Sequence, residues 1–226
     1  MIRRACACAR EGGAIKQTAI FHTHFESGAT LVDHHGWQIP SSFSAPGDEA
    51  ASARASVGIA DVSWMSKFEL QGHGLKEPPV LEPVAHVWLL GRLRYLVTCL
   101  PSSNSTVQER IRQAAAAWAP AAPVYLTDVT SVYTHLLLAG PRSREVLSKL
   151  TSLNLSERGL GNLTCAQANL AHVHALVLRK DMKGLPAYHV LVSREYGESA
   201  WESVLHAGHE FGITPFGLQA EQLLQG

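Results

Sequence analysis

The sequence predicts an α+β protein made of two similar halves, because the same order of segments occurs twice. Asp61-Val62-Ser63 leads through a strand-like run to Gly72, and Asp128-Val129-Thr130 leads through another to Gly140 after a nearly equal interval. Two strand-like segments and a helix-like segment follow in each copy, so that the full unit is an internal β-α-β-β-α repeat. A repeat in fixed order implies two α+β half-domains packed about a pseudo-two-fold axis.

Length and charge set limits on the class of protein. A chain of 226 residues is long enough for one large domain or two small halves with a shared core. The 19 Lys and Arg residues balance the 19 Asp and Glu residues, so no general attraction to nucleic acid or to an anionic membrane is expected. No apolar run reaches the roughly 18 residues that span a bilayer, and no apolar secretory segment stands at the N-terminus. We expect a cytoplasmic protein.

Residues 1–17 are expected to form a disordered tail, and residues 18–226 to form the folded domain. The tail begins with a basic, Ala-rich stretch whose first acid is Glu11, and an organellar presequence is the alternative interpretation. Cys6 and Cys8 have no second Cys or His pair at zinc-finger spacing. We therefore expect free thiols in a reducing compartment.

The first half is expected to span about residues 59–120 and the second half about residues 126–212. Helices are predicted over 44–56, 105–118, 141–150 and 198–211, with a short helix or turn over 18–24. Strands are predicted over 29–32, 67–70, 85–90, 93–100, 134–138, 170–178 and 188–193. The two halves differ in the segments that follow Gly72 and Gly140. Pro141 suits the first position of a helix, whereas three prolines between His73 and Pro83 exclude the equivalent helix from the first half.

Histidines occur in two clusters that could serve a chemical or a structural purpose. Four N-terminal histidines raise the question of a metal site: His22, His24, His34 and His35. They fall in two unlike settings without a carboxylate or thiolate at helical spacing, so no metal site is expected. His172 and His174 share one face of a predicted strand and are interpreted as the polar face of a half-buried sheet, with a pocket lining as the alternative.

Nucleophilic and nucleotide-binding motifs are not found in the sequence. There is no Gly-x-Ser-x-Gly elbow, no Gly-x-Gly-x-x-Gly loop and no Walker A loop, so a hydrolase or a nucleotide-binding protein of those types is not expected. Asp61 and Asp128 are interpreted as turn formers. The large apolar side chains of the first half are expected mainly in the core, with one or two facing a cavity between the halves: Trp37, Trp64, Met65, Trp88 and Tyr95.

Three groups of unusual residues stand in a fixed order along the chain. They are Gly36-Trp37-Gln38-Ile39-Pro40 with Glu49, Arg54 and Gly58-Ile59-Ala60-Asp61-Val62-Ser63-Trp64-Met65; then Gly140-Pro141 with Val146-Leu147; and finally Gly212-Ile213-Thr214-Pro215-Phe216-Gly217-Leu218-Gln219-Ala220. In this order and spacing, residues 18–225 resemble the glycine-cleavage T-protein (aminomethyltransferase) superfamily. That superfamily also contains folate-binding T-protein-like repair proteins and the T-protein-like parts of sarcosine oxidase.

The resemblance implies a fold and a ligand. It implies the T-protein type of folate-binding fold, with tetrahydrofolate in a central cavity and cofactor contacts at Met65, Trp64, Asp61 and Tyr188. It also implies transfer of an aminomethyl carbon from a lipoyl arm to the folate, which is chemistry of positioning and proton transfer at a bound cofactor. No catalytic residue is assigned.

The chain departs from the family pattern at the site. The loop that carries the family's essential acid corresponds to the stretch between Gly72 and Ala85, where no residue matches it. The glutamate that clamps the pterin becomes Leu185, and Glu221 stands where the family has Arg. The C-terminal β-barrel of full-length T-proteins is missing as well. Loss of a charge-assisted partner for the pterin typically costs about 2 to 4 kcal/mol.

We therefore expect a non-catalytic or folate-binding T-protein paralogue, similar to the γ subunit of heterotetrameric sarcosine oxidase and acting as a subunit of a one-carbon oxidoreductase assembly. The alternative is a tetrahydrofolate-dependent aminomethyltransferase or methyltransferase, in which Met65 contacts the cofactor and Asp61 or Glu49 supplies the missing carboxylate. An acid in the cavity would favour the enzyme. A wide apolar patch on the side left open by the missing barrel would favour the subunit.

Overall fold

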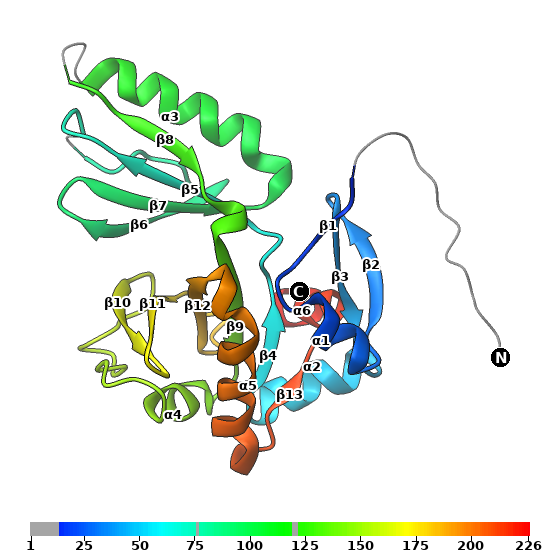
Figure 1. The fold of residues 1–226 in the computed structure, drawn as a ribbon. Coiled ribbons are helices and arrows are strands. Elements are labelled where there is room, and N and C mark those ends of the chain that lie inside the picture. Colours follow the sequence, from blue (N-terminus) through cyan, green and yellow to red (C-terminus); the bar gives the residue numbers. More distant parts are fainter. Residues whose placement is uncertain (1–13, 76, 119–121) are drawn as a thin grey trace.

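The computed structural model describes residues 14–75, 77–118 and 122–226, which form three β-sheets with helices packed against them (Figure 1). The smallest sheet has the order β1-β3-β2 and contains β1 (Lys16–Gln17), β2 (Thr30–His34) and β3 (Trp37–Ser42). Two helices accompany it, α1 (Phe21–Glu26) and α2 (Pro46–Ala55). Of the predicted tail, residues 1–13 lie outside the described residues, while Lys16 and Gln17 pair with β3 instead of remaining unstructured.

A four-stranded antiparallel sheet has the order β6-β7-β5-β8. Its strands are β5 (Ser66–Gln71), β6 (Ala85–Gly91), β7 (Arg94–Cys99) and β8 (Tyr125–Asp128). Helix α3 (Asn104–Trp118) lies along one face of this sheet (Figure 1). Phe68 and Leu70 of β5 share a buried apolar cluster with Val107 and Ile111 of α3, and this burial fixes the helix on the sheet.

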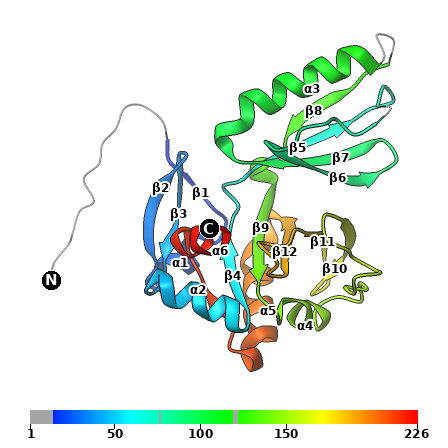
Figure 2. The same ribbon diagram turned by 180° about the vertical axis from the view of Figure 1, so that it is seen from behind.

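A six-stranded sheet has the order β10-β11-β12-β9-β4-β13. Its strands are β4 (Gly58–Asp61), β9 (Tyr133–Ala139), β10 (Cys165–Leu170), β11 (Val173–Arg179), β12 (Ala187–Ser193) and β13 (Thr214–Pro215). The remaining helices are α4 (Ser143–Ser148), α5 (Gly197–Gly208) and α6 (Leu218–Gln225). Trp201 of α5 lies in the main core with Leu136 and Val190 of the sheet, whereas α6 lies beside α2 and the smallest sheet (Figure 2).

The predicted internal repeat is present, and the two copies exchange a strand. The strand before β5 is β4, which pairs with β9 in the six-stranded sheet; the strand before β9 is β8, which pairs with β5 in the four-stranded sheet. The registers are equivalent, because Asp61 is opposite Leu136 and Asp128 is opposite Phe68. Each predicted half therefore contributes one strand to the sheet of the other half.

One predicted strand is wrong in detail. Residues 170–178 were expected to form a single strand, but the chain turns back at Ala171 and His172, which join β10 to β11. Both residues have positive φ angles, 48° and 71°, and this conformation is uncommon without Gly or Asn. His172 consequently lies in the turn, while His174 lies on β11 with an exposed side chain, as the polar-face interpretation predicts.

The segment after Gly72 forms no helix over residues 73–75 and 77–84, whereas Ser143–Ser148 forms α4 after Gly140. This difference between the halves agrees with the proline content of the first. No helix within the described ranges is both long and apolar enough to span a bilayer.

Candidate functional site

The two strand crossings are built from the same hydrogen bonds. Asp61 Oδ1 accepts from the backbone N–H of Ser63 at 3.0 Å, and Asp128 Oδ1 accepts from the backbone N–H of Thr130 at 2.8 Å. Each Asp thus closes a turn on the residue two positions later, as predicted. The same residue, Ser63 or Thr130, then binds the opposite strand through its hydroxyl oxygen.

That second contact brings Lys67 and His135 to equivalent places at the centre of the molecule. The hydroxyl oxygen of Ser63 accepts from the backbone N–H of His135 at 3.0 Å, and that of Thr130 accepts from the backbone N–H of Lys67 at 3.0 Å. Both side chains are buried. The ammonium group of Lys67 donates to the carbonyl oxygens of Ser63 at 3.0 Å and Met65 at 2.6 Å.

Burial determines how these two central bases ionise. It lowers the pKa of Lys67 to about 7, although the charges of Asp61 and Asp128 oppose the effect. Burial also lowers the pKa of His135 well below its usual value, with further lowering by His189 and Lys67. His135 Nε2 lies 2.8 Å from His189 Nδ1, so one imidazole donates and the other accepts.

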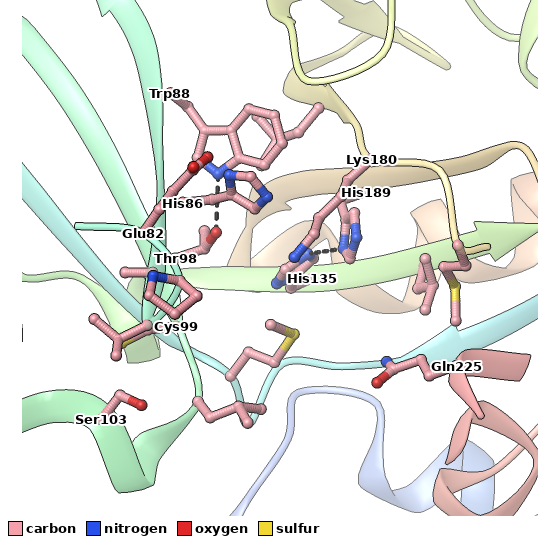
Figure 3. A pocket seen from close by; sticks show the side chains of 18 of the residues that line it. Glu82, His86, Trp88, Thr98, Cys99, Ser103, His135, Lys180, His189 and Gln225 are labelled. Atoms are coloured by element: carbon pink, nitrogen blue, oxygen red, sulfur yellow. Dashed lines mark hydrogen bonds between the residues drawn. The ribbon is translucent and has the colours of Figure 1, made fainter. Parts of the chain in front are cut away.

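Beside the His135–His189 pair, a cavity of about 710 Å³ lies between the four-stranded and six-stranded sheets (Figure 3). Its lining comes from both sheets, from the loop before β6, from the β11–β12 turn and from α6. The side chains that carry its chemistry are Glu82, His86, Trp88, Thr98, Cys99, His135, Lys180, Asp181, His189, Glu221 and Gln225. Cys99 is a poor nucleophile here, because burial raises the pKa of its thiol to about 11.

Glu221 is the buried carboxyl group of the cavity. Burial raises its pKa to about 7, although a hydrogen bond from Gln225 Nε2 at 2.9 Å opposes that shift. A carboxyl group with this pKa is present in both protonation states near neutral pH. It can therefore accept hydrogen bonds from a ligand or exchange a proton with it.

The cavity contains one of the four predicted cofactor contacts. Met65 lines it, but Trp64 does not. Trp64 belongs to a buried cluster with Trp37 and Ile39, and the ring of His34 lies against it at a centroid distance of 4.5 Å. The apolar run around Trp64 therefore builds the core under the smallest sheet.

Asp61 and Tyr188 are also not among the residues that line the cavity. The Asp61 carboxylate accepts from Ser63 and lies 3.1 Å from His24 Nε2, so its oxygens are engaged in structural bonds. Tyr188 is buried in the main core, with Arg179 over its ring. Adjacent residues of a strand face opposite sides, and His189 therefore faces the cavity in place of Tyr188.

Two further residues from the sequence analysis also have structural roles. The Glu49 carboxylate accepts from the backbone N–H groups of Phe43 at 2.6 Å, Ser44 at 2.5 Å and Gly217 at 2.8 Å, which ties α2 to the C-terminal segment. Leu185 packs against a buried apolar cluster. Within the described ranges, no group of three His, Cys, Asp or Glu side chains is placed to hold a metal ion.

Lys67, His135, His189 and Glu221 were not predicted as site residues from the sequence. A partial signal for the first two was present, because the internal repeat places Lys67 six residues after Asp61 and His135 seven residues after Asp128. No local pattern marked Glu221, which was noted only as a departure from the family. Its importance depends on where α6 packs.

Fold and site together define a class: an α+β protein in which two strand-exchanged half-domains enclose a cavity of ligand size. Residues 85–225 match the family model described as the GCVT N-terminal domain. The chain belongs to this family, and the T-protein-like superfamily and fold class predicted from the sequence are confirmed.

Relatives and solved structures agree with this assignment. The chain is 27% identical to an aminomethyltransferase of Acidobacterium capsulatum over 94% of its own length and 62% of the relative, and 27% identical to one of Halothermothrix orenii over 93% and 64%. It thus spans a little under two thirds of these relatives. Its fold is similar to the glycine cleavage system aminomethyltransferase T of Bartonella henselae, with a TM-score of 0.70 at 16% identity over 93% of this chain and 62% of that one.

A second solved structure is similar over most of its own length. It is a chain of the heterotetrameric sarcosine oxidase of Corynebacterium sp. U-96, with a TM-score of 0.55 at 19% identity, covering 74% of this chain and 92% of that one. At this identity the likeness shows the fold alone.

Proposed function

We propose that this protein is a T-protein-like folate-binding protein of one-carbon metabolism that holds a reduced folate in the central cavity and acts as a non-catalytic subunit of a larger assembly. The cavity itself carries the proposal. Its volume of about 710 Å³ falls among the 300 to 1,000 Å³ of ordinary ligand pockets, and it combines apolar walls with a few polar groups.

The lining suits a flat heterocycle that carries N–H donors. Trp88 and Met65 supply apolar surface, and Glu221 supplies a carboxyl group. Glu221 Oε1 is bonded to Gln225, and no described residue hydrogen-bonds to Oε2. That oxygen can accept from a pterin edge, so Glu221 takes over the clamping function that Leu185 cannot perform.

Two observations support a non-catalytic subunit. The acid next to Lys180 in the cavity turn, Asp181, is held by Arg179 through two bonds of 3.0 Å, which leaves it poorly suited to proton transfer. In addition, the sarcosine oxidase chain that this fold covers to 92% is part of a heterotetramer.

The transferase is the second candidate, and Glu221 is the observation that favours it. A carboxyl group with a pKa of about 7 in a cavity is well matched to general acid–base catalysis near neutral pH. Asp61 and Glu49, which the sequence suggested for this purpose, are engaged in structural hydrogen bonds. An aminomethyltransferase built on this chain would therefore depend on Glu221.

Calorimetric titration with tetrahydrofolate and 5-formyltetrahydrofolate tests the proposal. We expect micromolar binding, and we expect Glu221→Gln to weaken it about 10- to 100-fold at about pH 8, where the carboxylate is ionised. Glu210→Gln is the matched control, because Glu210 pairs with Lys149 and is not among the cavity-lining residues. The proposal fails if no binding is detected up to about millimolar folate.

A turnover assay separates the two candidates. The folate-loaded protein is mixed with an aminomethyl-lipoyl carrier, and methylene-tetrahydrofolate is measured by absorbance. Folate binding without turnover supports the subunit. Turnover that disappears in Glu221→Gln supports the transferase.

A further inference from the structure

One wall of the central cavity carries basic side chains from both sheets. His86 comes from β6 of the four-stranded sheet, Lys180 follows β11, and His189 comes from β12. Figure 3 shows Lys180 reaching toward the His135–His189 pair, with His86 projecting into the same space. His86, Lys180 and the His135–His189 pair lie near one another because the two sheets face each other across the cavity.

Glu82 is the acid of the cavity lining whose charge acts on Lys180 and His86, but it is not close enough to pair with either of them. No ion pair joins Lys180 or His86 to a carboxylate in the part of the chain that the structure describes. The adjacent acid, Asp181, is already held by the Arg179 guanidinium. His135 Nδ1 is buried and has no hydrogen-bond partner among the described residues.

The surroundings of these basic groups disfavour their charged forms. The Lys180 side chain is accessible from the cavity, yet surrounding protein lowers its pKa, with Glu82 opposing. Burial lowers the pKa of His86 and Lys180 lowers it further, while the charge of Glu82 opposes both effects. Burial and the neighbouring Lys180 and His86 charges lower the pKa of His189 to about 3. An anion in this space would offset the cost of holding these groups charged.

We propose that His86, Lys180 and the His135–His189 pair form a binding subsite for a carboxylate of the cavity ligand. At neutral pH the histidine pair is uncharged, so the wall offers one ammonium group and neutral imidazole groups. That set matches a monoanionic carboxylate and leaves a phosphate dianion only partly neutralised. The subsite rests on the proposed folate-binding function, and in a folate the group it takes is a carboxylate of the glutamyl tail.

Glu221 and this basic wall then give the cavity two chemically opposite ends. A carboxyl group from α6 faces the donors of a pterin, and the ammonium of Lys180 faces the tail. A ligand with a donor-rich ring and an anionic tail would be bound in one orientation.

Three probes separate these two ends by calorimetry: 5-formyltetrahydrofolate, 6-methyltetrahydropterin, which lacks the tail, and p-aminobenzoylglutamate, which lacks the ring. We expect Lys180→Met to raise the Kd of both tail-bearing probes about 10- to 100-fold and to leave that of the pterin within about twofold. Lys180 is accessible, so its replacement leaves the packed core unchanged.

Two lysine variants serve as controls. Lys183→Met removes the same charge from the same cavity, but the Lys183 ammonium is held by the carbonyl oxygen of Gly226, so little effect is expected. Lys149→Met removes a charge that is not at the cavity. The subsite is overturned if Lys180→Met has no effect on the tail-bearing probes, or if Lys183→Met has an equal one.

The outcomes for ring and tail are independent. If p-aminobenzoylglutamate binds through Lys180 while neither pterin-bearing probe binds, the folate proposal fails and the carboxylate subsite stands for another carboxylate ligand. If 5-formyltetrahydrofolate binds and is insensitive to Lys180→Met, the folate proposal stands and the subsite fails. If no probe binds, both fail.

Discussion

At the scale of single residues, the two aspartates of the repeat have the same turn geometry but different surroundings. Asp61 is buried and accepts from Ser63 while facing His24 at 3.1 Å, whereas Asp128 is exposed and accepts from Thr130. We expect Asp61→Asn to lower the free energy of unfolding by about 2 to 4 kcal/mol and Asp128→Asn by about 1 kcal/mol. Urea unfolding of both variants measures this, and equal losses would contradict it.

The same aspartate predicts a dependence on acid. Burial acts to raise the pKa of Asp61, but the bonds from His24 and Ser63 outweigh it and hold that pKa below its usual 3.8. The stability it contributes is therefore present above about pH 4 and is lost as the pH falls through the lowered native pKa. The difference in the free energy of unfolding between wild type and Asp61→Asn should become smaller as the pH falls below about 4.

Glu221 predicts the opposite dependence. Its pKa rises from 4.5 in the unfolded chain to about 7 in the native protein, so its contribution is full below pH 4.5 and is lost as the pH rises through about 7. The change amounts to roughly 3 kcal/mol. We expect Glu221→Gln to gain that much stability relative to wild type between about pH 4 and pH 8, as measured by urea unfolding. If the free energies of unfolding of the two proteins change in parallel with pH, the pKa of Glu221 is not raised in the native protein.

Residue-level prediction from sequence succeeded where a role depends on local chain geometry. The turns at Asp61 and Asp128 follow from the side chain and the residues just after it. The expected cofactor contacts Trp64 and Tyr188 do not line the cavity, because strand alternation and helix packing decide which side of an element meets it. A shift of one residue separates buried Tyr188 from cavity-lining His189.

At the scale of elements, two glycines end equivalent strands where another backbone comes close. A Cβ on Gly72 would lie 2.2 Å from the carbonyl oxygen of Pro123, and one on Gly140 would lie 2.3 Å from that of Ser56. Their φ angles are 153° and 135°, which disfavour any side chain. The carbonyl oxygen of Ser56 also accepts from the backbone N–H of Arg142 at 3.0 Å, which holds the end of α2 against the turn into α4.

We expect Gly140→Ala to lower the free energy of unfolding by at least about 2 kcal/mol, because both the conformation and the contact oppose a methyl group. Gly36→Ala is the control, since Gly36 has a φ of 75° but open space around its Cβ position. It should lose only about 1 kcal/mol. If thermal unfolding shows equal losses, the close contact has no effect of its own.

Helices were easier to predict than strand boundaries. The predicted 44–56 and 105–118 segments correspond to Pro46–Ala55 and Asn104–Trp118, because Ala-rich composition and apolar spacing are local signals. The β10–β11 hairpin was missed because Ala171 and His172 give no composition signal for positive φ angles. The strand Tyr125–Asp128 was missed because its pairing with β5 is a long-range contact.

At the scale of the whole molecule, strand exchange makes the two sheets depend on each other. Strand β4 pairs with β9 and leads into β5, while β8 pairs with β5 and leads into β9, so each sheet contains a strand that continues into the other sheet. Contacts between the sheet edges add to this, since Gln167 Nε2 donates to the carbonyl oxygen of Leu90 at 2.7 Å.

We therefore expect one cooperative unfolding transition. Native-state hydrogen exchange at rising urea measures it: amides of β7 in the four-stranded sheet and β12 in the six-stranded sheet should reach the same opening free energy. A clearly lower value for β7 would mean that the four-stranded sheet opens alone. The internal repeat was visible in the sequence, but this exchange was not, because a repeat does not show which copy each strand joins.

The exchanged strands also indicate how a two-fold repeat protein of this kind can arise. A chain of half this length, ending with its helix, would leave its leading strand unpaired and would find the missing partner in a second identical chain. The product would be a symmetric homodimer with the same crossed strands, and joining two gene copies would turn it into a single polypeptide. Once joined, the halves can differ: in this chain one half has prolines where the other has α4, and the equivalent sites hold Lys67 in one and His135 in the other. A symmetric dimer has no distinct ends to its central space, whereas the fused chain is free to place an acid at one end and bases at the other.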